Sequence, residues 1–296
     1  MCKKLTPYML LVPQILLTVL FLIGLVTGIT QSLGVIPAFG LTKPTLTYYK
    51  EVLTKPDMVK SVIYSLQIAF FSALLSTVAG VLLCAMLVTG RRTRGKMMRI
   101  VQLPIVVPHV VVALFFIQIC SQNGLLARIA YGLGLIGDQQ EFPAIIYDGQ
   151  GTGIILAYLW KEIPFIIYFV IALMANIDGK LGEAAVNLGA DNIQTFFRVT
   201  LPLCAHTIFS GFLIIFVFSL GAYELPFILG ATTPKALPVQ AYIQYTHPDL
   251  QNRPYAMALN GIIILIALLS ACVYFVLMKK NLRGLTGDRQ IRRGKD

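Results

Sequence analysis

Long, uninterrupted apolar runs dominate the pattern of hydrophobic and polar positions along this chain. Six of them are long enough to consider as membrane spans, at residues 8–30, 61–88, 101–120, 154–177, 206–229 and 255–278. A helix needs roughly 20 consecutive apolar residues to cross a bilayer. The runs are continuously apolar and do not alternate with a period of two, which favours helices over the strands of a barrel. We therefore predict an all-α integral membrane protein with about six transmembrane helices.

Composition supports one membrane domain over residues 1–296, without room for a separate soluble domain. Hydrophobic residues make up 57% of the chain and charged residues 12%, whereas a soluble domain carries about 25% charged residues. The first apolar run exceeds the roughly 7–15 residues of a signal-peptide core. We therefore expect it to be a retained helix.

The basic residues indicate how the spans are oriented. The net charge of +11 comes from Lys and Arg beside the apolar runs, which is typical of topology signals and does not favour a nucleic-acid surface. If the N-terminus lies inside, most of these residues fall on the inner side, including Arg91, Arg92, Arg94, Arg289, Arg292 and Arg293. This predicts two cytoplasmic termini and a cytoplasmic loop between the fourth and fifth helices. The C-terminal tail is also a candidate contact with anionic membrane lipid.

The loop at residues 181–202 has a pattern of its own. Leu181, Ala184, Ala185 and Leu188 recur at i, i+3, i+4 and i+7, which defines one face of a helix. Gly189 can adopt the left-handed conformation that ends a helix. Small alanines permit close approach of another backbone, so this face suits a partner.

A second short helix should follow. Asp191 or Asn192 can cap it, and Ile193, Phe196 and Phe197 would form its apolar side. Thr200 can cap the next span, and Pro202 fits that span's first turn. The prediction is two short helices joined by a glycine hinge, with Glu183 as a polar contact or a capping residue. An amphipathic surface helix without a partner would produce the same spacing.

The order of residues in this loop is E-A-A, three residues, Gly, nine residues, an aliphatic residue, one residue, then Leu-Pro. It resembles the cytoplasmic EAA loop of ABC-importer permeases, with matches at Glu183, Ala184, Ala185, Gly189, Leu201 and Pro202. Val199 stands where isoleucine is more usual. The resemblance implies that these residues fit a cleft on a separate ATPase subunit.

The resemblance covers residues of about 60–280. Residues 160–165 match the family segment W-K-x-x-P-F, and residues 221–230 with Leu237-Pro238 resemble the subgroup that serves polyamines, ferric iron, thiamine and aminoethylphosphonate. It implies a permease subunit for a small solute in the bacterial inner membrane, and the subgroup match favours a polyamine-like substrate. The implied partners are a second permease subunit, ABC ATPase subunits that bind ATP-Mg, and an extracytoplasmic solute-binding protein.

Charged residues inside spans are costly and are therefore candidates for a substrate path. Glu162 lies next to Lys161 in the fourth run, and Glu224 lies next to Tyr223 in the fifth. An acidic lining would suit a cationic substrate. The alternative for each is a hydrogen bond between helices. Prolines in the same runs, at positions 104, 108 and 164, should interrupt helical hydrogen bonds.

Enzymatic chemistry has little support in the sequence. Residues 90–97 fit G-x4-G-K, but Met97 replaces the hydroxyl residue that a phosphate loop needs. His109, His206, His247 and the five cysteines are dispersed, so we expect neither a bound cofactor nor a metal site. The remaining alternatives are an ATPase-independent secondary transporter or channel, and a membrane enzyme. Inverted repeats or broken helices in corresponding halves would mark the transporter.

Overall fold

Regular structure in this protein is helical. The computed structural model describes residues 6–90 and 95–293, and side chains for residues 11–90, 95–177 and 179–279. Within these residues, the β-type pairing is limited to one isolated antiparallel bridge between Ile36 and Leu41. Six helices in the described part of the chain are long and apolar enough to cross a membrane, which confirms the predicted all-α fold. The basic residues Arg91, Arg92 and Arg94 lie outside the described residues, as do the side chains of Arg289, Arg292 and Arg293.

The chain forms two compact units. One comprises residues 1–60 and 237–265, and the other comprises residues 61–236 and 266–296. The prediction that residues 1–296 form a single transmembrane domain, like the orientation of the termini, stays a prediction.

The first unit joins the N-terminal helix to the beginning of the last one. Its elements are α1 (Thr6–Ser32), η2 (Pro37–Phe39), α2 (Thr47–Thr54), α12 (Leu237–Tyr245), η6 (Leu250–Asn252) and the first part of α13 (Arg253–Arg293). The Tyr49 hydroxyl donates to Ser32 Oγ at 2.8 Å. A Cβ added at Gly261 would lie 2.2 Å from the Tyr49 hydroxyl oxygen, so α13 approaches α2 closely because this position is glycine.

A polar contact also joins α2 to α13. The Tyr255 hydroxyl donates to Glu51 Oε2 at 2.6 Å, and Lys55 Nζ lies 3.0 Å from the same oxygen. The Tyr255 hydroxyl, followed by the Lys55 ammonium, holds the pKa of Glu51 below its ordinary value. These contacts therefore favour the ionised carboxylate.

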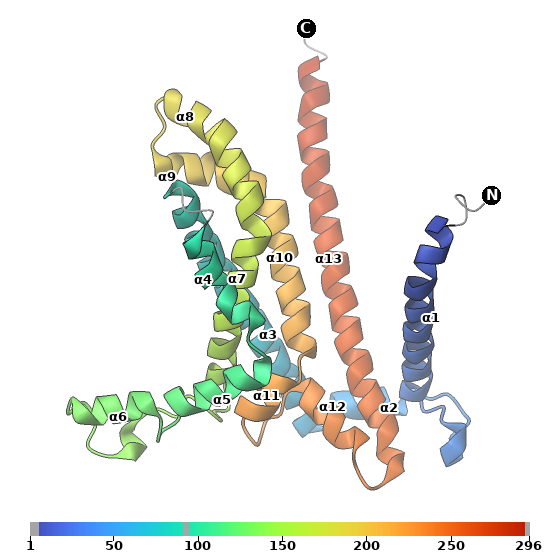
Figure 1. Ribbon diagram of the computed structural model, residues 1–296. Helices are drawn as coiled ribbons and strands as arrows, with labels where there is room; N and C mark the ends of the chain where they lie inside the picture. The colour runs from blue at the N-terminus through green and yellow to red at the C-terminus, as the bar shows by residue number, and fades with distance from the viewer. Residues whose placement is uncertain (1–5, 91–94, 294–296) are drawn as a thin grey trace. The chain divides into compact units, whose positions relative to one another are not determined.

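The second unit contains the remaining spans. Its elements are most of α3 (Pro56–Thr89), α4 (Lys96–Val106), α5 (His109–Cys120), α6 (Leu125–Gly132), η3 (Gln139–Glu141), α7 (Thr152–Ile177), η4 (Asp178–Gly182), α8 (Glu183–Asn187), α9 (Asn192–Thr195), η5 (Phe196–Thr200), α10 (Leu201–Gly221), α11 (Glu224–Leu229) and the rest of α13. Helices α7 and α10 lie side by side, with α8 and α9 at one end and α11 at the other (Figure 1).

Helix α7 is the centre of this unit. Ile154, Tyr158, Ile166, Val170 and Met174 have no exposed surface, and they recur at multiples of four positions, a row that winds slowly around the helix because four residues turn it by about 400°. That spacing follows the 3.6-residue turn of an α-helix. Helix α7 contacts α4, α5, α10 and α11, so its buried side chains meet neighbours on several sides. Burial of this stripe positions the other spans around α7.

A buried carboxylate fastens three spans together. Glu162 on α7 is 3% exposed. Its Oε2 accepts a hydrogen bond from Ser76 Oγ of α3 at 3.0 Å, and its Oε1 accepts one from Ser219 Oγ of α10. A buried polar group without partners is strongly destabilising in a membrane. The serines therefore make Glu162 a link between α3, α7 and α10.

Lys161 stabilises a break in the third predicted span. The sequence predicts one helix over residues 101–120, but α4 ends at Val106 and α5 begins at His109. Pro108 has no N–H to continue the helix, and it forces the preceding Val107 into an extended conformation (φ −69°, ψ 128°). Lys161 Nζ donates to the carbonyl oxygens of Ile105, at 3.3 Å, and of Val107.

The fifth predicted span, residues 206–229, is also divided. Helix α10 ends at Gly221, Ala222 is extended (φ −75°, ψ 135°), and α11 follows. In a continuous helix the carbonyl of Ala222 would need the N–H of residue 226, which is Pro226. The other two prolines behave differently, because α4 continues through Pro104 and α7 through Pro164.

We expect Lys161→Met to destabilise the protein. The substitution keeps the apolar stem but leaves the two carbonyls at the α4–α5 break without their donor. Unsatisfied acceptors at this part-buried position should lower the free energy of unfolding by about 1 kcal/mol, the lower end of the cost of a buried unsatisfied acceptor. Unfolding of the purified protein in detergent, by heat or by SDS, measures the change.

Lys96→Met is the matched control, because Lys96 is an exposed lysine at the start of α4. Its effect should stay within about 0.5 kcal/mol, as for most surface substitutions. Equal stability of the two variants would contradict the assigned role of Lys161.

Candidate coupling site

The loop at residues 181–202 consists of the ends of two long helices. Helix α7 passes without a break into the π-helix η4 and then into α8. After a turn, α9 passes into the π-helix η5 and then into α10. The predicted turn between two helices at Gly189 is confirmed, but α8 and α9 continue into the spans and are not separate short helices. The predicted single face from Leu181 to Leu188 is wrong, because Leu181 lies in η4 and Leu188 lies beyond the end of α8.

Gly189 makes the turn between the two helices. Its φ is +95°, which is the region that glycine occupies without strain. The N–H of Gly189 donates to the carbonyl of Val186 at 2.9 Å, and that of Ala190 donates to the carbonyl of Ala185 at 3.1 Å. This pair of bonds is the Schellman motif that closes a helix C-terminus.

The following helix is capped by Asp191, one of the two predicted residues. Its Oδ1 accepts from the backbone N–H of Gln194 at 2.6 Å. The predicted cap at Thr200 is wrong, since the chain is already helical there and its hydroxyl makes no capping bond. Pro202 occupies the first turn of α10, as predicted.

Apolar side chains project from the tip of this loop. Leu188 is 90% exposed, Ile193 is 70% exposed and Phe197 is 58% exposed. They lie on both sides of the Gly189 turn. Apolar surface gathered in this way is typical of a contact with another protein or a membrane.

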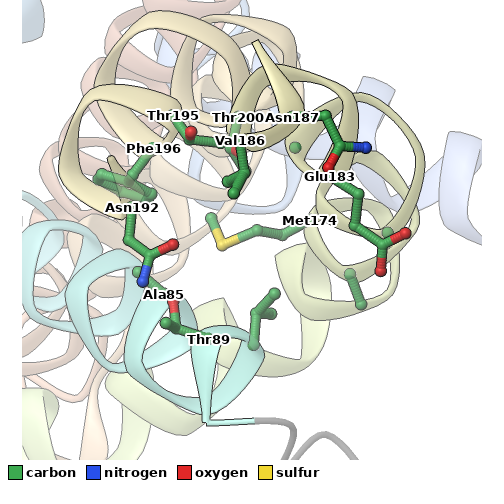
Figure 2. Close-up of a pocket in the computed structure, with 14 residues that line it drawn as sticks. Ala85, Thr89, Met174, Glu183, Val186, Asn187, Asn192, Thr195, Phe196 and Thr200 are labelled. Atoms are coloured by element: carbon green, nitrogen blue, oxygen red, sulfur yellow. The ribbon is translucent and has the colours of Figure 1, made fainter. Parts of the chain in front are cut away.

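The residues of the E-A-A-to-Leu-Pro pattern fall into two places. Glu183 and Ala184 are exposed on α8, and Ala185 is half-buried. Leu201 and Pro202 are the first two residues of α10, on the other side of the Gly189 turn. Glu183 also lines a cavity of about 630 Å³ between the loop and the ends of α3 and α7 (Figure 2), whereas Ala184, Leu201 and Pro202 do not line it.

The path candidates have separate partners. Glu162 is enclosed by its two serines, which matches the alternative of a hydrogen bond between helices. Glu224 begins α11 and is 55% exposed, with Oε2 3.5 Å from Nδ1 of His109 on α5. The Tyr223 ring stacks on that of Phe227, with centroids 4.9 Å apart. Whether these residues line a path stays a prediction.

Sequence reasoning missed the partners of these charges. Ser76, Ser219 and His109 come from three different helices, and single polar residues in apolar runs do not reveal which helix faces they share. Only the partners of Lys161 had a signal in the sequence, because Pro108 predicts a helix break that leaves backbone carbonyls without their helical donors. Within the described residues, no group of three or more His, Cys, Asp and Glu side chains is placed to hold a metal ion.

Comparison with known proteins identifies relatives over most of the chain. Residues 76–282 match the family model of the binding-protein-dependent transport system inner membrane component. A probable molybdenum ABC transporter permease of Haloferax volcanii is 27% identical over 60% of this chain, and the match spans 60% of that relative's length. The sulfate transport system permease CysT of Salmonella typhimurium is 26% identical, with 77% of this chain and 79% of the relative covered.

A solved structure shares the fold. It is a crystal structure of a bacterial alginate ABC transporter in complex with an alginate pentasaccharide-bound periplasmic protein. The TM-score is 0.73 at 20% identity, over 92% of this chain and 93% of that one. The helical fold, the six spans and a family match over residues 76–282 agree, and the chain therefore belongs to the family of inner membrane components of binding-protein-dependent transport systems.

Proposed function

We propose that this chain is the permease subunit of an ABC importer and that the loop at residues 181–202 receives the movement of separate ATPase subunits. The observation that carries the proposal is the exposed apolar tip at Leu188, Ile193 and Phe197, on helices that continue into two membrane spans. Amphipathic helices commonly seat in grooves of partner proteins. The chain itself would bind no cofactor, and ATP-Mg would bind to the ATPases.

The proposed assembly contains a second permease subunit, identical or homologous, and two ATPase subunits. An extracytoplasmic solute-binding protein would deliver the substrate. The complex of the alginate transporter with a periplasmic protein supports such a partner for a protein of this fold.

Force would pass along the helices. A displacement of the tip acts on α8 and η4 and then on α7, because these elements are continuous. Glu162 ties α7 to Ser76 of α3 and Ser219 of α10, so the three spans would move together. Nucleotide binding drives such a change only if it stabilises one permease conformation more than the other.

For the substrate we propose a small anion. Relatives described as molybdenum and sulfate permeases support this class, and they give no support to the polyamine-like substrate expected from the sequence. The neighbouring His109 and Glu224 bring both signs of charge to one place, so local charge alone does not select the class. The comparisons also give no support to a secondary transporter or channel.

Gly189→Ala should weaken ATPase association and uptake. A Cβ at this position meets open space, so the penalty comes from the positive φ alone. That penalty is about 1–2 kcal/mol for an L-residue. It corresponds to about a five- to thirtyfold lower population of the turn conformation. Copurified ATPase and uptake in proteoliposomes measure the effect.

Gly132→Ala is the matched control. Gly132 also faces open space, but its φ is not positive, so this variant should behave as the parent does. Normal coupling in a well-folded Gly189→Ala protein would count against the proposed role of the loop.

Glu224→Gln separates the two substrate classes. The substitution removes a half-exposed negative charge, and such charges contribute roughly 0.2–1 kcal/mol. Uptake of sulfate or molybdate at limiting concentration should be retained or rise by up to about fivefold, with ATPase association unchanged. A loss of uptake for an amine, with no response for either anion, would return the substrate to the cationic class.

A further inference from the structure

Two π-helices flank the coupling loop. Residues Asp178–Gly182 form η4 between α7 and α8, and residues Phe196–Thr200 form η5 between α9 and α10. A π-helix bonds each N–H to the carbonyl five residues earlier, and it usually appears as a single turn within an α-helix. Such turns are among the few identifiable causes of sharp helix kinks. Each side of the loop is therefore joined to its membrane span through one π-helical turn, in which backbone hydrogen bonds link residues five positions apart instead of four.

Two buried threonines, Thr195 at the end of α9 and Thr200 at the end of η5, have hydroxyls that make no hydrogen bond. Thr195 is 4% exposed and Thr200 is 2% exposed, and neither hydroxyl has a partner. In α-helices, a Thr hydroxyl can donate to the carbonyl four residues earlier. Thr18 and Thr27 of α1 do this at 2.8 Å. In an α-helical register, the Thr200 hydroxyl would have the Phe196 carbonyl as its acceptor.

The cavity gives the loop space to move. It lies between the end of α3, at Ala85 and Thr89, and the side chains of α8 and α9, with Met174 of α7 reaching into it (Figure 2). Its volume is about 630 Å³. Polar side chains make up much of its wall, and the apolar side chains of Met174, Val186 and Phe196 would gain packing contacts if it closed.

We propose that η4 and η5 are hinges that pass between π and α register, and that this exchange swings α8, α9 and the Gly189 turn toward the end of α3. Each residue of an α-helix turns the chain by about 100° and advances it by about 1.5 Å. A change of one residue in register therefore redirects everything beyond the hinge. The loop moves as a unit without unwinding, while the Thr200 hydroxyl gains its acceptor and the cavity closes.

The consequence for transport rests on the proposed function, since the ATPase would drive this exchange. The exchange itself is a property of the chain, so it is tested on the full chain alone in lipid nanodiscs. Failure of this test would leave the ATPase-docking proposal standing, and failure to bind an ATPase would leave the hinges standing.

Spin labels at Met86 of α3 and Gln194 of α9 report the distance across the cavity. Both side chains are exposed, and the five native cysteines are replaced beforehand. Pulsed electron paramagnetic resonance should show two distances, of which the shorter belongs to the closed cavity. A single distance in the parent chain would overturn the proposal.

Three variants assign the two distances. Ala85→Phe fills the cavity from α3 and should abolish the shorter distance. Deletion of Arg198, an exposed residue of η5, removes the extra residue of the π turn and should leave one distance. Thr200→Val removes the hydroxyl that gains a partner on closure, and should lower the ratio of closed to open states by about fivefold.

Thr77→Val is the matched control for the hydroxyl. Thr77 is buried on α3 with a hydroxyl that also lacks a partner, but it does not line the cavity. This variant should leave both distances and their proportions unchanged. Equal effects of Thr77→Val and Thr200→Val, or two distances that persist in Ala85→Phe, would overturn the proposal even if the deletion variant fails to fold.

Discussion

The structure of the second unit depends on one buried carboxylate. Glu162 lies where water does not reach, so its oxygens must be satisfied by protein donors, and Ser76 and Ser219 supply them from two neighbouring spans. The apolar stripe of α7 provides attraction without direction. The hydrogen bonds to Glu162 add direction, because they are met only when α3 and α10 have one particular register against α7. Lys161, the next residue, similarly fixes the break between α4 and α5.

The same constraint links the membrane spans to the coupling loop. Because α7 and α10 are held to each other, the two arms of the loop have fixed bases, and the turn at Gly189 joins their far ends. Close-packed interiors transmit strain, so a displacement that reaches α7 is passed on to α10. The π-helices η4 and η5 are the irregular places between base and tip, which is why flexibility is expected there.

The sequence predicted the features that local chemistry determines. The lengths of the apolar runs were sufficient for six spans, the left-handed turn at Gly189 follows from residue type, and the cap was narrowed to Asp191 or Asn192, of which the structure uses Asp191. Local sequence did not determine whether each span is one continuous helix. Pro104 and Pro108 are chemically identical, yet α4 continues through one and ends before the other, and at the second position Lys161 donates to the carbonyls of Ile105 and Val107.

Other features required the three-dimensional arrangement. Threonine commonly caps helices, but Thr200 caps nothing because η5 continues into α10 without a break. The partners of Glu162 and Glu224 come from helices distant in sequence, so their spacing carried no signal. The sequence could not predict the π-helices either, because a change of one residue in the hydrogen-bond register of a helix requires no distinctive amino-acid composition.

Photo-crosslinking from the tip of the loop tests the central claim most directly. A benzophenone amino acid replaces Leu188, which is 90% exposed, or, as the control, Leu135, which is 73% exposed on the segment after α6. Irradiation of native membranes followed by mass spectrometry should give an adduct with an ABC ATPase from position 188 and not from position 135. An intact chain that forms no ATPase adduct at 188, in membranes where a known ABC permease does so, would contradict the account.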